Sequence, residues 1–154
     1  MKYKILTFTT TLALLSSIAL ADINPKDGTW KAEIDSSKVT GCPNMMKSMI
    51  SKQSMKPQSK KVDFSEPFHP RSLFEESGQL KWKKMGTNKW QAVMKQGGGG
   101  TDVDIKWSIH VVSDSKMKVS SNASMKFPPQ MAAMFGGSGE CKAVSSGTYN
   151  YIGN

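Results

Sequence analysis

The strongest structural signal in the chain is an alternation of apolar and polar residues over two neighbouring stretches. Residues 102–111 alternate without a break, and residues 116–127 repeat the pattern after an Asp114-Ser115 turn signal. Such alternation is typical of strands with one buried face and one solvated face. The inward set is Val103, Ile105, Trp107, Ile109 and Val111, then Met117, Val119, Ser121, Ala123, Met125 and Phe127. These stretches predict a long antiparallel hairpin.

Shorter alternating stretches predict further strands on both sides of this hairpin. They are residues 29–34, 62–64, 80–85, 90–94 and 141–151. A turn signal at Gly86-Thr87-Asn88 joins two of them into a second hairpin. Gly147 is a candidate β-bulge in the last strand. The four glycines at 97–100 predict a connection instead of a strand.

One helix is predicted at 43–54. Pro43 suits a first helical position, and Met46, Met49 and Ile50 follow a helical stripe. The fold class is therefore mainly β, an antiparallel up-and-down meander of about six to eight strands with one short N-terminal helix. Since such a sheet hides only one face, we expect it to curl into a barrel or half-barrel.

The first residues have the features of an export signal. Lysines precede an apolar stretch at 5–20, and Ala19-Leu20-Ala21 supplies the small residues of a cleavage site. Residues 1–21 are therefore predicted to be a signal peptide and 22–154 a single β-rich domain, periplasmic or secreted. The alternative is an uncleaved anchor, although the apolar stretch is short for a membrane span. No transmembrane segment is expected after cleavage.

The exported part contains two cysteines, Cys42 and Cys141. In an oxidising compartment two lone cysteines most simply form one disulfide. A metal or redox pair is the alternative, but the chain has no CxxC spacing to favour it.

Two short motifs carry a resemblance to known families. Gly28-Thr29-Trp30 stands near the start of the exported part, and Thr101-Asp102 follows the glycine run. In these the chain resembles the calycins, the lipocalin- and avidin-like barrels, and also small exported bacterial proteins of unassigned function. It departs from lipocalins in having no Arg after Arg71 and in placing its helix after the first strand. The calycin resemblance implies an interior cavity for a small apolar ligand.

The chain offers little for catalysis. Its histidines are His69, between Phe68 and Pro70, and His110, on the polar side of a predicted strand. Motifs for nucleophilic or metal-assisted hydrolysis are missing from the sequence. Asp102 and Asp104 share a strand face, where solvated carboxylates are ordinary. We therefore predict a non-enzymatic protein with no catalytic residues.

The aromatic residues favour a binding function. The alternation directs four tryptophans toward one apolar interior, where they are the predicted ligand-binding residues for a small apolar ligand or partner segment. They are Trp30, Trp82, Trp90 and Trp107. No cofactor is expected under this hypothesis.

The methionines support an alternative, a periplasmic Cu(I)-binding protein. Thioethers are soft ligands suited to Cu(I), and a three-residue spacing places two of them on one helix face. The candidate ligands are Met45, Met46, Met49, Met131 and Met134. Methionine also fills irregular cores and adaptable surfaces without any metal.

The charge supports a third hypothesis, interaction with an envelope component. The formal net charge is +9, and loss of Lys2 and Lys4 with the signal peptide leaves +7. A lysine-rich face can make peripheral contact with anionic surfaces. Because Arg71 is the only arginine, nucleic acid is not an expected partner. The apolar segment 127–135 is either a partner patch or a plug over the interior.

Overall fold

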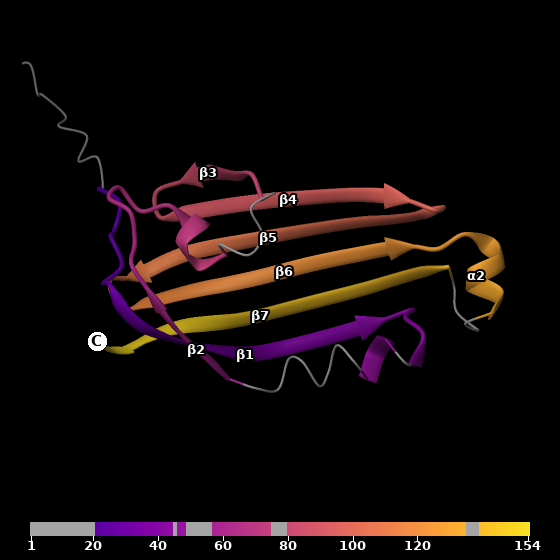
Figure 1. Cartoon of the computed structure of the whole chain (residues 1–154), viewed down its shortest axis with the longest axis horizontal. Coiled ribbons are helices and arrows are strands. Elements are labelled where there is room, and N and C mark those ends of the chain that lie inside the picture. Colours follow the sequence, from indigo (N-terminus) through magenta and orange to yellow (C-terminus); the bar gives the residue numbers. More distant parts are fainter. Residues whose placement is uncertain (1–20, 45, 49–56, 75–79, 135–138) are drawn as a thin grey trace, which may run out of the picture.

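The chain forms one antiparallel sheet of seven strands (Figure 1). The computed structural model describes residues 21–44, 46–48, 57–74, 80–134 and 139–154. Its elements are β1 (Gly28–Thr40), β2 (Gln58–Val62), the 3-10 helix η1 (Pro70–Leu73), β3 (Trp82–Gly86), β4 (Lys89–Gly98), β5 (Thr101–Ser113), β6 (Lys116–Lys126), α2 (Pro129–Met134) and β7 (Glu140–Gly153). The predicted mainly β meander is thus confirmed, with a strand count inside the expected range.

The order of the strands is β2-β1-β7-β6-β5-β4-β3. Strands β3 to β7 follow one another as hairpins, and β1 lies between β7, the last strand, and the short β2. The edge strands β2 and β3 are not paired with each other, so the sheet formed by the described residues is open. A closed barrel is therefore not seen.

The alternation predicted for β5 and β6 sorts side chains onto two faces, as expected. Register pairs Ile109 with Val119 and Val119 with Gly147, so apolar residues form rows across the strands. The rows of the other face are mostly polar; Ser108, for example, pairs with Ser120, although exposed Val93 and Val144 also belong to this face. We call these the apolar face and the polar face.

The buried core occupies only one half of the apolar face. Its buried members are Trp30, Val62, Phe68, Leu73, Ile109, Val111 and Met117. Three of them, Val62, Phe68 and Leu73, come from the end of β2 and the segment that follows it to the end of η1, at the end of the sheet where the C-terminus lies (Figure 1). This half of the apolar face is the proximal half, and the half toward α2 is the distal half (Figure 1).

A bulge lies where β1 crosses from the proximal to the distal half. Ile34 pairs with Gly147, and Ser36 pairs with Ser146, so Asp35 is the extra residue. The bulge therefore lies in β1, opposite the glycine that the sequence singled out. A Cβ on Gly147 would stand 2.3 Å from the carbonyl oxygen of Glu33, which explains why glycine is needed there.

The glycine run differs from the prediction. Gly97 and Gly98 extend β4 and pair with Asp102 and Thr101. The turn is confined to Gly99 and Gly100, with φ of 60° and 81°. Two consecutive positive φ values match the twist of a tight hairpin, so the ladder continues up to the turn.

The N-terminal helix predicted at 43–54 is not shown as an element among the described residues. Residues 44 and 46–48 are helical, and Lys47 N donates to Pro43 O over 3.0 Å. Most of the rest of the predicted helix at 43–54 lies outside the described residues. Residues 127–135 were predicted to form an apolar loop, but Pro129–Met134 form helix α2. Prolines at its start favour helix initiation, and Ala132 N donates a hydrogen bond to Pro128 O.

The predicted disulfide between Cys42 and Cys141 is present. Both cysteines are buried, and they join the chain just after β1 to the start of β7. The bond therefore clamps the distal end of the β1–β7 ladder and closes a loop with a sequence separation of 99 residues.

Removing this bond should destabilise the domain strongly. In the chain-entropy description, a loop of about 100 residues contributes roughly 4–5 kcal/mol to the free energy of unfolding. We expect the double variant Cys42→Ala, Cys141→Ala to lose about 4 kcal/mol in urea unfolding, as should the reduced wild-type protein. A loss below about 1 kcal/mol would show that strand pairing alone holds the β1–β7 ladder.

The residues before β1 are bound to the β3–β4 turn. The Asp22 carboxylate accepts hydrogen bonds from Lys84 Nζ and from Asn88 N, the latter over 3.0 Å. Ile23 N in turn donates to Asn88 Oδ1 over 2.7 Å. The hydrogen bond from Lys84, more than any other contact, lowers the pKa of Asp22 below its ordinary value of 3.8.

This contact predicts a pH dependence. Because the pKa of Asp22 is lower in the folded chain, its contribution to stability is present above pH 3.8 and is lost as the pH falls through the lowered value. We expect the melting temperature of Asp22→Asn to fall less between pH 5 and 2 than that of the wild-type protein. Asp63→Asn, at an exposed carboxylate without a described partner, should keep the wild-type slope. Equal slopes in all three proteins would contradict the prediction.

Candidate functional site

Trp30 is at the centre of the core. Its side chain is fully buried, with ring centroids 5.7 Å from Phe64 and 5.8 Å from Tyr151, both edge-on. The indole Nε1 donates to Lys26 O over 2.9 Å. These contacts account for its burial, and they leave its ring packed on protein side chains.

Trp82 and Trp90 lie at the rim of the same core and are partly buried. The Trp90 ring centroid is 5.1 Å from that of His69, and the Trp82 centroid is 5.3 Å from that of Phe74. The structure thus brings three of the four predicted ligand-binding tryptophans into one aromatic cluster.

Trp107 is the exception. It is half-buried on the apolar face and does not belong to the core cluster. Beside it is a hollow of about 150 Å³, here called the Trp107 hollow. Its apolar lining consists of Ala32, Ile34, Phe74, Trp107, Val119 and Tyr149.

The Trp107 hollow has a small polar floor. Ser121 and Ser145 lie across from each other on β6 and β7, and their hydroxyl oxygens are 2.8 Å apart. On another side of the hollow, burial raises the pKa of Tyr149, so its phenol stays neutral. The hydroxyl groups of Ser121, Ser145 and Tyr149 therefore border the hollow without carrying a charge.

Apolar rows continue from the Trp107 hollow along the distal half of the apolar face. Their residues are half-buried, unlike the buried core residues of the proximal half. They are Val39, Met94, Val103, Ile105, Ala123, Met125 and Ala143. Within the described residues, the extensive contacts between elements are all between paired strands. The hollow and these rows lie next to each other on the same face of the sheet, and together we call them the distal track.

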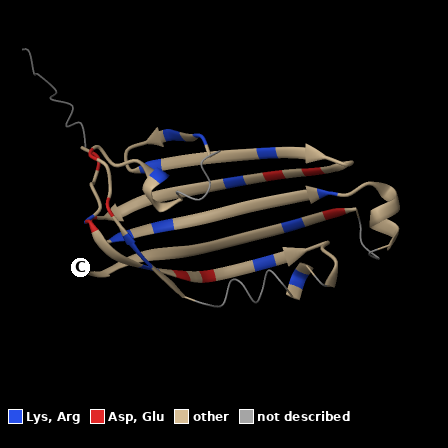
Figure 2. Ribbon diagram, in the orientation of Figure 1, with Lys and Arg blue, Asp and Glu red and all other residues tan. Residues whose placement is uncertain are grey.

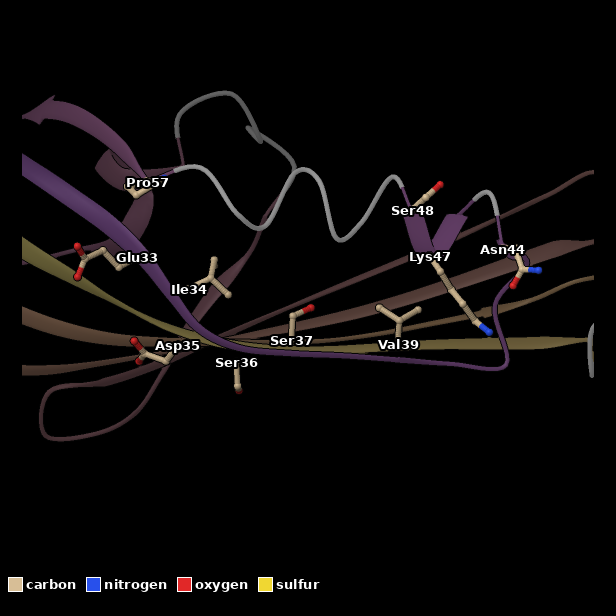
Figure 3. A pocket seen from close by; sticks show the side chains of 10 residues that line it. All are labelled: Glu33, Ile34, Asp35, Ser36, Ser37, Val39, Asn44, Lys47, Ser48 and Pro57. Carbon is tan, nitrogen blue, oxygen red and sulfur yellow. The ribbon is translucent and has the colours of Figure 1, made fainter.

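A larger hollow of about 970 Å³ lies beside β1 (Figure 3). Ile34, Ser37 and Val39 point into it, and Lys47 reaches toward them, while Asp35 points the other way. Residues 49–56 are outside the described residues, so the lining between Ser48 and Pro57 is not described. We assign no ligand to this hollow.

The predicted Cu(I) ligands are only partly described. Met45 and Met49 lie outside the described residues, and Met46 belongs to the short helical turn. On α2, Met134 is 83% exposed and Met131 is half-buried. The described residues contain no group of three His, Cys, Asp or Glu side chains placed to hold a metal ion. Copper binding stays a prediction.

The histidines have separate surroundings. His69 precedes η1 and its Nδ1 accepts a hydrogen bond from Arg71 N over 3.2 Å, a capping role that the sequence did not reveal. His110 lies exposed on the polar face of β5. Of the two candidate carboxylates, Asp104 is 3.5 Å from Lys95 Nζ. These residues do not converge on one site.

Comparisons with protein-family models, curated proteins and solved structures found no match to this chain. Across the described residues, no helix has the length and apolar character needed to cross a membrane. The functional argument therefore rests on the geometry of the sheet itself.

Proposed function

We propose that this chain is an exported, non-enzymatic binding protein that holds a small apolar ligand on the distal track. The observation that carries the proposal is the Trp107 hollow, where a half-buried indole borders about 150 Å³ of space on a sheet face whose other half is filled by core side chains.

The size of the hollow limits what can enter it. A cavity of about 150 Å³ with an apolar lining accommodates a group of roughly benzene size. The distal rows extend along the strands away from it, so an elongated molecule could place a ring or chain end beside Trp107. Burying its apolar surface contributes about 25 cal/mol per Å² removed from water.

The polar floor suits a ligand with at most one weakly polar end. Ser121 and Ser145 bond to each other, and the described residues contain no buried side-chain polar atom without a partner. An apolar ligand therefore leaves no hydrogen bond unmade. A hydroxyl or ester group could still exchange with the serine pair, since each hydroxyl both donates and accepts.

Two methionines of the distal track add adaptability. Met94 and Met125 lie on β4 and β6 and are half-buried. Their unbranched thioether side chains adjust to different ligand shapes at little cost. This supports recognition of a chemical class, apolar and elongated, more than of one compound.

Export is the second part of the proposal. A disulfide is typical of oxidising compartments outside the cytosol. Asp22, the first residue after the expected cleavage site, already makes hydrogen bonds to the β3–β4 turn. The domain would therefore keep these contacts after removal of residues 1–21. Peripheral envelope contact through the lysines stays an open alternative.

The proposal predicts binding of N-phenyl-1-naphthylamine, an apolar probe that fluoresces when it leaves water. We expect a saturable rise in probe emission together with quenching of tryptophan emission. Trp107→Phe should remove most of that quenching while Trp90→Phe preserves it, because only Trp107 lies beside the hollow.

A pair of neighbouring substitutions separates the two faces. Ala123→Arg puts a charge on the distal track and should weaken probe binding at least about tenfold, since a buried unpaired charge is costly. Ser124→Arg adds the same charge on the polar face and should leave binding unchanged. Failure of the wild-type protein to bind, or equal losses in the two variants, would refute the proposal.

A further inference from the structure

The polar face has its own hollow, of about 540 Å³, on the opposite side of the sheet from the distal track. Its lining extends from Met85 on β3 to Asp35 on β1, although β4, β5, β6 and β7 lie between these strands. In a flat sheet those residues would be five strand spacings apart, roughly 24 Å. One hollow bordered by both indicates that the sheet curves toward its polar face and forms a trough.

A row of basic groups crosses the trough. Register pairs Lys89 with His110 and His110 with Lys118, on β4, β5 and β6. Directly opposed residues on antiparallel strands have Cβ atoms about 5 Å apart. The two ammonium groups therefore flank the imidazole closely enough for all three side chains to contact one anionic group.

A row of neutral hydrogen-bonding side chains runs beside the basic row. Register places Gln91 opposite Ser108, Ser108 opposite Ser120, and Ser120 opposite Ser146. All four residues line the trough. Hydroxyl and amide groups both donate and accept hydrogen bonds, as the hydroxyl groups of a sugar do.

The lysines of the basic row are not neutralised by described residues. Lysines 26, 31, 84, 95 and 142 each have a carboxylate partner within 4 Å, whereas Lys89 and Lys118 have none among the described residues. Figure 2 shows how basic and acidic residues are spread over the strands.

Two acidic residues are near the far end of the trough. Asp35 lines the trough from β1, which lies two strands across the sheet from β6 and Lys118. Glu33 continues the row of Lys118 through Thr148, but its carboxylate is 2.7 Å from Lys31 Nζ. The part of the trough over β4 to β6 is therefore lined by two lysines and by no carboxylate among its described residues.

We propose that this trough binds an acidic saccharide, a sugar bearing a carboxylate or phosphate group. The anionic group lies against Lys89, His110 and Lys118, and the sugar hydroxyls bond to the Gln91–Ser108–Ser120 row. The exposed thioether of Met85 provides an apolar wall for the C–H face of a sugar ring. Lysines act here as point charges and tolerate either type of anion. This site is separate from the distal track and does not depend on it.

The test is isothermal titration at low ionic strength with four probes: trigalacturonic acid, glucose 6-phosphate, neutral maltotriose and inorganic phosphate. We expect at least one of the two acidic sugars to bind, and the one that binds more tightly shows whether the site prefers a carboxylate or a phosphate. Maltotriose should bind at least about tenfold more weakly than that sugar. Added salt should weaken the interaction. The proposal is overturned if neither acidic sugar binds. It is also overturned if glucose 6-phosphate is the only sugar that binds and inorganic phosphate binds as tightly.

Matched variants locate the site. Lys89→Gln combined with Lys118→Gln should reduce affinity for the acidic sugar about tenfold. Lys106→Gln combined with Lys126→Gln removes the same charge from the same face outside the trough and should change affinity less than about twofold. Ser108→Ala with Ser120→Ala should weaken sugar binding while leaving phosphate binding intact. Equal losses in the two lysine pairs would show that net charge alone attracts the ligand, and would refute the site.

Discussion

Pairing between the first and last strands is the constraint on which the rest of the structure depends. Strand β1 joins β7 over almost its whole length, and the Cys42–Cys141 bond holds the distal end of this ladder. Without the pairing of β1 with β7, the five-strand meander from β3 to β7 would lose Trp30, the centre of its core. The same ladder carries the bulge that separates the filled half of the apolar face from the exposed half.

An unequal division of one apolar face produces the proposed binding surface. The segment from Val62 to Leu73 supplies three side chains to the buried core of the proximal half, whereas at the distal half the described segment after β1 supplies only Cys42 and Pro43 as buried residues. Trp30 and Trp107 share a face and an alternation pattern, yet one is fully buried and the other borders a hollow. Coverage by a loop, not residue type, decides which of them can meet a ligand.

Local patterns predicted much of this sheet, and long-range packing decided the rest. The alternation that includes Ile105 and Ala123 predicted both the central hairpin and its apolar face, because the two-residue period of a strand can be recognised from consecutive residues. The distal half of β1 was missed since Ser36, Ser37 and Lys38 show no apolar alternation; pairing with β7 makes them a strand. The polar trough could not be predicted either, because its rows join residues from separate strands through their register.

The position of β1 also bears on how the domain reaches its folded state. Among the described strands β1 comes first in the sequence and β7 comes last, so β1 has to wait for β7 before Thr29 can pair with Gly153. Contacts so distant in sequence slow folding, since a large loop must close before they form. Until β7 pairs, the edge of β1 that β7 occupies in the folded sheet is open, and an unpaired strand edge is a template for pairing with another chain.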